Sequence, residues 1–319
     1  MTKERSTIVL FTFVPKEQQQ RRLLDEFPDV TFLFTYHDKS RLEEAEIIVT
    51  YGEDLAEKDI DRAKKLKWIM VASAGIEKMP ASTIQKKGIT VSNVRGIHKT
   101  PMSESVLAHL LALKRSLPFI YEQQRKGEWN RKSGATELAG STALILGPGA
   151  IGSEIGRLLQ AFGVRTIGCN RSGNNANFME KTVPYPELMA VLPEADVVIS
   201  VLPSTPETRH LLTEAHFYAM KDNAVFMNFG RGDLVSDQVL IHALEEKLIS
   251  WAVLDVFETE PLPKDHPFWT MDNVIVSPHV SSHSTKYVER SLDIFIPNLK
   301  KWLKGKRDFT NIVNLERGY

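Results

Sequence analysis

The sequence is poor in several features that mark particular classes of protein. It contains one cysteine, Cys169, among 319 residues, which excludes an internal disulfide and a cysteine-based metal site. Its 40 basic and 40 acidic side chains cancel, so no net positive field attracts nucleic acid. No apolar run reaches the roughly 18 residues that span a bilayer. We therefore expect a cytoplasmic protein that binds no nucleic acid, no membrane and no metal.

Length and composition predict a globular protein of two domains. The chain is longer than one typical core, and its residues are 42% hydrophobic and 25% charged, as in soluble globular proteins. It shows no short-period repeat and no low-complexity segment. Residues 2–5 are polar and lead directly into a short strand pattern, which is not the pattern of a signal peptide.

Strand and helix patterns alternate in two series, which predicts an α/β protein with two Rossmann-like, doubly wound parallel-sheet domains. A helix at 103–117, with Pro101 as its start signal, lies between the series, and a polar segment at 125–140 should cross the surface. The amphipathic helix 287–303 should return to the first sheet. The first domain is therefore discontinuous, with residues 1–98 plus 284–319, and the second has residues 99–283. The expected strands are 7–11, 30–36, 46–51, 68–72 and 90–92, then 143–146, 165–169, 197–201, 224–229, 251–256 and 274–277; the other expected helices include 16–26, 57–64, 79–86 and 151–162.

A glycine-rich turn at residues 147–152 is the most informative local feature. A continuous apolar run at 142–146 precedes it, as expected of a parallel strand buried on both faces, and an amphipathic helix follows it. Gly147 and Gly149 leave room for a tight turn and for a pyrophosphate near the backbone, and Gly152 lets the helix pack on the strand. The helix start offers free N–H groups to phosphate. This context predicts dinucleotide binding; the alternative is an ordinary glycine turn.

Polar residues that core packing does not explain follow three later strands of the second series. Arg231 lies between two glycines, Glu260 precedes a proline, and His279 follows the pair Ser277-Pro278. Parallel sheets place function at the carboxyl ends of their strands. Taken singly, these residues would be a surface cation, a turn and a solvated histidine. Their appearance at three successive strand ends predicts a catalytic set.

Together these motifs resemble the D-isomer-specific 2-hydroxyacid dehydrogenase family over nearly the whole chain. The segment Ser73-Ala74-Gly75-Ile76 also matches. The resemblance implies an oxidoreductase that transfers a hydride between a nicotinamide cofactor and a small 2-oxo acid or D-2-hydroxy acid. It assigns substrate binding to the flavodoxin-like first domain and the dinucleotide to the second.

The resemblance also implies which residues form the site. Arg231, Glu260 and His279 would be catalytic, and Asp255 would hold the nicotinamide amide, with a surface carboxylate as the alternative. The expected substrate contacts are Ser73, Ala74, Gly75, Arg231 and His279. The expected cofactor contacts are Gly147, Gly149, Ala150, Ile151, Gly152, Asn170, Arg171, Ser172, Leu202, Pro203, Thr208, Phe229, Gly230, Arg231, Asp255 and His279.

These residue types suit the reduction of a 2-oxo acid, which needs a hydride at the carbonyl carbon and a proton at its oxygen. Imidazole titrates near neutral pH, so His279 is the expected proton donor. Glu260 would stabilise the imidazolium and orient the ring, and Arg231 would bind a carboxylate or the developing oxyanion. Backbone N–H groups near Gly75 would hold the substrate carboxylate, and closure of the cleft would exclude water. His283 is a weaker candidate for lining the cleft.

The cofactor preference is predicted from the second strand of the nucleotide fold. NAD enzymes of this fold place Asp or Glu about 20 residues after the glycines, to bind the ribose hydroxyls. Here the strand ends in Asn170, Arg171 and Ser172, without a carboxylate. These side chains would donate to a 2′-phosphate, so we predict NADP. The alternative is NAD, with Arg171 stacked on the adenine.

Glyoxylate and hydroxypyruvate are the expected substrates, because the sequence resembles reductases of these acids in two features. These are the Arg-Ser pair in the cofactor loop and a tryptophan shortly before the histidine, here Trp269. Branched or aromatic 2-oxo acids remain open, since the pocket depends on loops such as 50–54. One alternative function is an NAD(P)-sensing, corepressor-like binding protein, and another is a dehydrogenase of the same fold that acts on formate or phosphite. The joint presence of Arg231, Glu260 and His279 favours an enzyme.

Similar enzymes are homodimers that associate through the nucleotide domain, so we expect a homodimer. The apolar helix 103–117 and the following Phe119-Ile120-Tyr121 are the expected contact. The alternative is that these residues are buried within one chain.

Overall fold

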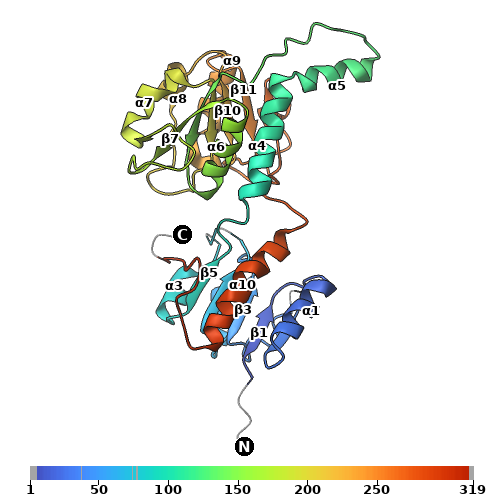
Figure 1. Cartoon of the computed structure of the whole chain (residues 1–319), viewed down its shortest axis with the longest axis vertical. Coiled ribbons are helices and arrows are strands. Elements are labelled where there is room, and N and C mark those ends of the chain that lie inside the picture. Colours follow the sequence, from blue (N-terminus) through green and yellow to red (C-terminus); the bar gives the residue numbers. More distant parts are fainter. Residues whose placement is uncertain (1–5, 37, 74, 77, 316–319) are drawn as a thin grey trace, which may run out of the picture. The chain divides into compact units, whose positions relative to one another are not determined.

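A computed structural model gives the structure of the chain, and it describes residues 6–36, 38–73, 75–76 and 78–315 (Figure 1). The chain forms two compact units, Met1–Ile97 with Ser284–Tyr319, and His98–His283. Each unit has its own parallel sheet with helices beside it, which confirms the predicted α/β class with two Rossmann-like domains. Within the described ranges, no helix combines the length and apolar character that crossing a membrane requires.

The first unit contains a five-stranded sheet in the order β2-β1-β3-β4-β5, and all its neighbouring strands are parallel. Helix α10 packs on this sheet, as its amphipathic pattern predicts, and Phe295 and Leu299 join Trp68 in the buried core. The elements are β1 (Ile8–Phe11), α1 (Glu17–Glu26), β2 (Thr31–Phe34), β3 (Ile47–Thr50), α2 (Glu57–Arg62), β4 (Trp68–Val71), α3 (Ala81–Lys86), β5 (Thr90–Asn93) and α10 (Tyr287–Leu303).

The second unit contains a seven-stranded parallel sheet in the order β12-β11-β10-β9-β6-β7-β8. Its central strands are buried along their whole length, because apolar clusters cover both faces of the sheet. The helices and strands are α4 (Lys99–Lys114), α5 (Leu117–Lys126), β6 (Thr142–Leu146), α6 (Ala150–Ala161), β7 (Arg165–Asn170), β8 (Lys181–Pro184), α7 (Leu188–Val191), β9 (Val197–Ser200), α8 (Glu214–Ala219), β10 (Val225–Asn228), α9 (Asp237–Glu245), β11 (Trp251–Leu254) and β12 (Val274–Val276). The short 3-10 helices are η1 (Tyr185–Glu187), η2 (Leu192–Glu194), η3 (Gly232–Leu234) and η4 (Pro267–Trp269).

Two sequence-based predictions about this unit are wrong. The sheet has seven strands rather than the six that were expected. The strand that was not predicted is β8, because it is a half-exposed edge strand without a continuous apolar run. Helix α4 begins at Lys99, so Pro101 lies in its first turn, where its missing N–H costs no hydrogen bond. The polar segment expected to cross the surface at 125–140 follows the end of α5 at Lys126, and residues 127–137 are irregular and mostly exposed, as predicted.

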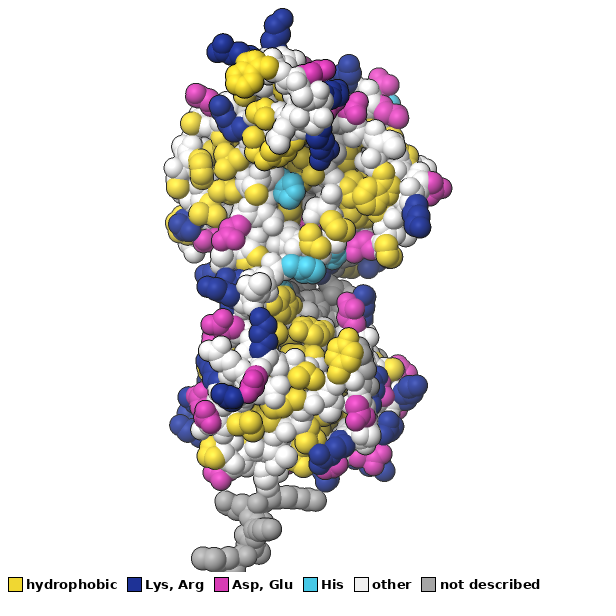
Figure 2. All heavy atoms as spheres, turned by 90° about the vertical axis from the view of Figure 1, so that its right-hand side faces the viewer, with side chains coloured by type: hydrophobic (Ala, Val, Ile, Leu, Met, Phe, Trp, Pro, Cys, Tyr) yellow, Lys and Arg dark blue, Asp and Glu magenta, His cyan; other side chains and the backbone are white. Residues whose placement is uncertain are grey.

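Helix α5 and the residues after it extend away from the body of the second unit (Figure 1). The side chains of Ile120, Tyr121 and Trp129 are exposed, and Trp129 is 94% exposed. Figure 2 shows the face that lies on the right-hand side of Figure 1. On the second unit, apolar side chains are spread over this face, and charged side chains lie mainly toward its edges. Exposed apolar side chains of this kind are common in protein–protein contacts.

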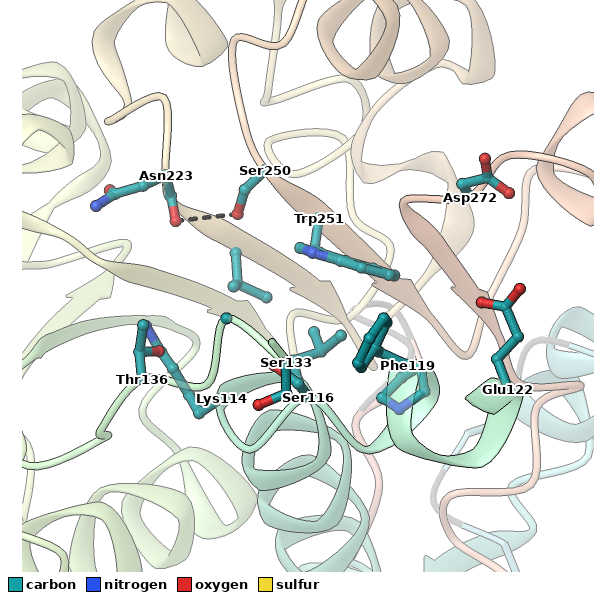
Figure 3. A pocket seen from close by; sticks show the side chains of 14 residues that line it. Lys114, Ser116, Phe119, Glu122, Ser133, Thr136, Asn223, Ser250, Trp251 and Asp272 are labelled. Carbon is teal, nitrogen blue, oxygen red and sulfur yellow. Dashed lines mark hydrogen bonds between the residues drawn. The ribbon is translucent and has the colours of Figure 1, made fainter. Parts of the chain in front are cut away.

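A cavity of about 720 Å³ lies between α5 and the amino ends of two strands. Figure 3 shows Phe119 of α5 and Trp251 of β11 on opposite walls of this cavity. Phe119 is therefore partly covered within its own chain, whereas Ile120 and Tyr121 are exposed. Val225 and Trp251 are the first residues of β10 and β11, so the cavity is at the opposite edge of the sheet from the carboxyl ends of the strands.

Candidate active site

The glycine turn between β6 and α6 forms an open approach to a helix start. Gly147 has a φ of +90°, a conformation that favours glycine. A Cβ at Gly152 would lie 2.4 Å from the carbonyl oxygen of Gly147, so only glycine allows this close packing of helix and turn. At Gly149 the same atom would meet nothing within 4 Å, and no side chain caps the helix there. The first-turn N–H groups of Ala150 and Ile151 fit a pyrophosphate that approaches from this side.

Leu202 lies against this turn and brings a second strand end to it. A Cβ at Gly147 would be 3.1 Å from the Leu202 side chain, and one at Gly230 would be 2.5 Å from the Leu202 carbonyl oxygen. Three cofactor contacts expected from the sequence therefore lie side by side. The buried hydroxyl of Thr208 donates to the carbonyl of Pro203 at 2.6 Å and so folds the turn after β9. Its expected contact with the cofactor stays a prediction.

The end of β7 forms a compact turn that uses part of its own polar groups. The Asn170 side chain accepts hydrogen bonds from the backbone N–H groups of Ser172 and Gly173, and it donates to Asn174. Asn170 therefore shapes the loop, while Arg171 is exposed. Hydrogen bonds from its own backbone and from Thr205 lower the pKa of the exposed Glu207, and the charge of Arg171 contributes further. A guanidinium thus stands at this loop without a carboxylate at the strand end itself.

Asn228 shapes the turn that carries Arg231 at the end of β10. Its buried side chain accepts a hydrogen bond from the N–H of Gly230 at 3.1 Å and donates to the carbonyl of Arg231 at 2.9 Å. Arg231 itself is half-buried, and its Nη1 donates to the carbonyl of Gly230 at 2.9 Å. The Asn228 side chain therefore holds the backbone of the turn at Gly230 and at Arg231. This role of Asn228 was not predicted from the sequence.

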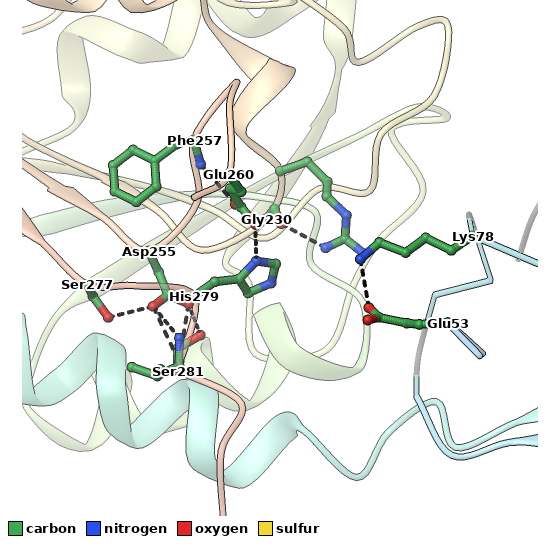
Figure 4. Close-up of polar contacts among 11 residues, drawn as sticks. Glu53, Lys78, Gly230, Asp255, Phe257, Glu260, Ser277, His279 and Ser281 are labelled. Carbon is green, nitrogen blue, oxygen red and sulfur yellow. Dashed lines mark hydrogen bonds and ion pairs between the residues drawn. The ribbon is translucent and has the colours of Figure 1, made fainter. Parts of the chain in front are cut away.

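Glu260 and His279 are in direct contact (Figure 4). Nδ1 of His279 lies 2.8 Å from Oε2 of Glu260, while Oε1 of Glu260 accepts a hydrogen bond from the N–H of Phe257 at 3.1 Å. The imidazole side chain is 45% exposed. His279 has a φ of +53°, a left-handed conformation in which histidine is more common than most residues. The pair combines an accessible ring with a carboxylate that fixes its orientation.

Asp255 holds the loop on which His279 lies. Its buried carboxylate accepts hydrogen bonds from the hydroxyls of Ser277 and Ser281 and from the N–H of Val280 at 3.0 Å. These partners come before and after His279 in the sequence, and Figure 4 shows Ser277 and Ser281 next to the Asp255 carboxylate. The structure thus gives Asp255 a role inside the protein, and its expected contact with the nicotinamide stays a prediction. Ser281 was not identified from the sequence, because nothing in its local pattern marks a partner at the end of β11.

Gly232 packs directly against the segment that carries Glu260. A Cβ there would lie 1.9 Å from the carbonyl carbon of Phe257 and 2.5 Å from the nitrogen of Glu258. The turn after β10 and the segment after β11 are therefore in backbone contact. This contact brings the chain next to Arg231 together with the chain next to Glu260.

The remaining expected residues are placed separately. Ser73 and Gly75 belong to the first unit, where the Ser73 hydroxyl donates to the Gly75 carbonyl at 2.8 Å; Ala74 lies outside the described residues. Their part in substrate binding stays a prediction. The Phe229 side chain is buried in the core of the second unit, and Pro203 and His283 are exposed.

Comparison with known proteins identifies relatives of this chain. Residues 107–281 match the family model described as D-isomer specific 2-hydroxyacid dehydrogenase, NAD binding domain. The chain is 34% identical over 286 residues to glyoxylate reductase from Aeropyrum pernix, which covers 87% of this chain and 85% of the relative. It is also 30% identical over 313 residues to D-3-phosphoglycerate dehydrogenase from Methanocaldococcus jannaschii, which covers 94% of this chain but 58% of the relative.

A solved structure is similar over almost the whole chain. It is an NADPH-dependent glyoxylate/hydroxypyruvate reductase from Sinorhizobium meliloti in complex with NADP and sulfate. The TM-score is 0.81 at 27% sequence identity, and the match covers 99% of this chain and 100% of that chain.

Proposed function

Since the chain belongs to the D-isomer-specific 2-hydroxyacid dehydrogenase family, whose members are NAD(P)-dependent oxidoreductases, we propose that it reduces a small 2-oxo acid with NADP(H). Glyoxylate and hydroxypyruvate are the proposed substrates. The contact of 2.8 Å between Glu260 and an accessible His279 carries this proposal, because it supplies an oriented acid/base group at the carboxyl edge of the sheet. The reductases named above are relatives, and they support this substrate class.

The bound nicotinamide would supply the hydride, and residues of the chain would supply the proton and bind the substrate. Nδ1 of His279 is engaged by Glu260, so Nε2 is the atom that donates the proton to the carbonyl oxygen. Glu260 keeps the ring in this orientation and compensates the positive charge of the imidazolium. Arg231 binds the substrate carboxylate or the oxyanion that develops as the carbonyl is reduced. In the oxidative direction His279 accepts the proton instead.

The direct test measures NADPH oxidation with a panel of 2-oxo acids. We expect glyoxylate and hydroxypyruvate to have specificity constants at least about tenfold above those of branched or aromatic acids, because a single methylene too many in a pocket that fits a small acid changes binding by about 1–3 kcal/mol. Formate and phosphite, assayed with the oxidised cofactor, are the control substrates for other dehydrogenases of this fold. A protein that binds NADPH but turns over none of these compounds would contradict the proposal and favour the sensing function.

We propose NADP(H) rather than NAD(H) because the end of β7 presents Arg171 and no carboxylate. Replacing Arg171 by alanine is expected to raise KM for NADPH about tenfold, since an arginine–phosphate contact contributes about 1–2 kcal/mol more than a neutral hydrogen bond. KM for NADH should change less than about twofold in the same variant. Steady-state kinetics with both cofactors measures the two effects.

Arg21→Ala is the matched control for this experiment, because Arg21 is an exposed arginine paired with Glu17 on α1. It should leave both KM values unchanged. An equal loss with NADPH and NADH in Arg171→Ala would contradict recognition of the 2′-phosphate. It would instead support the alternative in which Arg171 stacks on the adenine.

The homodimer expected from the sequence stays a prediction. The exposed side chains of Ile120, Tyr121 and Trp129 are the part of the second unit that would form its contact.

A further inference from the structure

Residues 255–266 carry Glu260, yet they belong to no helix or strand. They connect the end of β11 to η4. A segment of this kind is not held by a regular ladder of backbone hydrogen bonds, so side-chain contacts largely determine its shape. Two such contacts join it to the first residue of helix α9. Neither is used in the chemistry proposed above.

Glu258 provides the first contact. Its Oε2 accepts a hydrogen bond of 2.9 Å from the backbone N–H of Asp237, the first residue of α9. First-turn N–H groups have no acceptor within their own helix, and the helix dipole favours a negative charge at this end. The Glu258 carboxylate therefore binds at the start of α9, where free N–H groups and the helix dipole stabilise a negative charge. It lies two residues before Glu260, so this contact fixes the near side of the segment.

His266 provides the second contact. Its Nε2 lies 3.3 Å from Oδ2 of Asp237, and its side chain is 14% exposed. Its Nδ1 accepts a hydrogen bond from the N–H of Phe268 at 3.3 Å, so the ring proton belongs on Nε2 and is donated to Asp237. Burial raises the pKa of Asp237, and the charge of Glu258 raises it further, whereas His266 lowers it. His266 fixes the far side of the segment.

We propose that Asp237, Glu258 and His266, which we call the α9 clasp, are positioning residues that hold the Glu260 carboxylate against His279. Asp237 serves both contacts, with its backbone N–H for Glu258 and its carboxylate for His266. It also follows Arg231 by six residues, so the clasp joins the arginine-bearing turn to the segment with Glu260. This inference rests on the proposed function, because that function gives the Glu260–His279 pair its role.

The test replaces each side of the clasp in the whole chain. Glu258→Ala and His266→Ala are each expected to lower kcat for the best 2-oxo acid at least about tenfold, because displacements of about 1 Å in a catalytic group have effects of this size or larger. KM for NADPH should stay within about threefold, since the glycine turn is untouched. Amide hydrogen exchange in residues 255–266 should become at least about tenfold faster, because a lost tether lets the segment open.

Conservative and matched variants separate positioning from a general loss of stability. Glu258→Gln keeps an oxygen that accepts from the N–H of Asp237, and we expect its kcat within about threefold of the unmodified protein. His242→Ala removes the histidine of another His–carboxylate pair of α9, His242–Glu214 at 3.1 Å, and Glu245→Ala removes an exposed carboxylate from the same helix. Both controls should leave kcat and exchange in residues 255–266 unchanged.

Unchanged kcat and unchanged exchange in both Glu258→Ala and His266→Ala would overturn the clasp. If the unmodified protein reduces no 2-oxo acid, the proposed function fails, and exchange in residues 255–266 still decides whether these contacts hold the segment. If an alanine variant does not fold, Asp237→Asn takes its place, because it keeps the backbone N–H for Glu258 and weakens the contact to His266. Faster exchange in that variant supports the clasp, and exchange as in the unmodified protein overturns it.

Discussion

Replacing His279 by asparagine is expected to lower kcat for 2-oxo acid reduction by about 10²- to 10⁴-fold, the usual contribution of a positioned general acid. Asparagine is the right replacement because it tolerates the left-handed backbone of this position, where His279 has a φ of +53°. Its amide cannot supply a proton at neutral pH. The dissociation constant for NADPH should change little, since the phosphates would be bound at the glycine turn between β6 and α6.

Steady-state kinetics measures kcat, and cofactor fluorescence measures the dissociation constant for NADPH. His242→Asn is the control, because His242 also has a carboxylate partner, Glu214 at 3.1 Å, but lies on α9 and outside the proposed site. It should retain the full kcat. If His279→Asn kept more than about a tenth of the kcat of the unmodified protein, the proton would have to come from another group, and the proposed chemistry would be wrong.

The local motifs were predicted well because each depends on a few consecutive residues. The turn at Gly147 and the start of α6 at Ala150 follow from a strand, glycines and an amphipathic helix, which are all visible in the sequence. The expected contact between Glu260 and His279 is also present. These two residues follow β11 and β12, which are parallel neighbours, so their carboxyl ends meet at one edge of the sheet.

The contacts that fix these residues were not predictable, because they join segments that the sequence does not relate. Ser281 and Asp255 are 26 positions apart in the sequence. Serine and aspartate are also common on exposed loops, so their residue types do not indicate a contact. Asn170 shows a different difficulty. Its amide was expected to face a cofactor, which stays a prediction, and in the structure its oxygen also accepts hydrogen bonds from Ser172 and Gly173 and so folds its own turn. Residue type alone does not say which of its polar atoms take part in the local turn.

Replacing Gly232 by alanine is expected to lower kcat about 10²-fold and the stability of the second unit by about 1–3 kcal/mol. The added Cβ would lie 1.9 Å from the carbonyl carbon of Phe257, and these are backbone atoms that cannot rotate away. The segment must therefore move as a whole, and it carries Glu260, which contacts His279 at 2.8 Å. Gly232 is required here for space, whereas Gly147 also needs its positive φ.

Gly88→Ala is the control that separates stability from alignment. Gly88 has a φ of +63°, so alanine is strained there, but its Cβ would meet nothing within 4 Å. Gly88→Ala should lower stability by about 1 kcal/mol or more and leave kcat unchanged. Thermal unfolding measures the stability of the two variants. The values of kcat are compared at a temperature well below the unfolding transition of either variant. If Gly232→Ala lost stability yet kept kcat within about threefold, the backbone contact with Phe257 would not be what aligns Glu260 with His279, and the acid/base pair would owe its geometry to other contacts of residues 255–266.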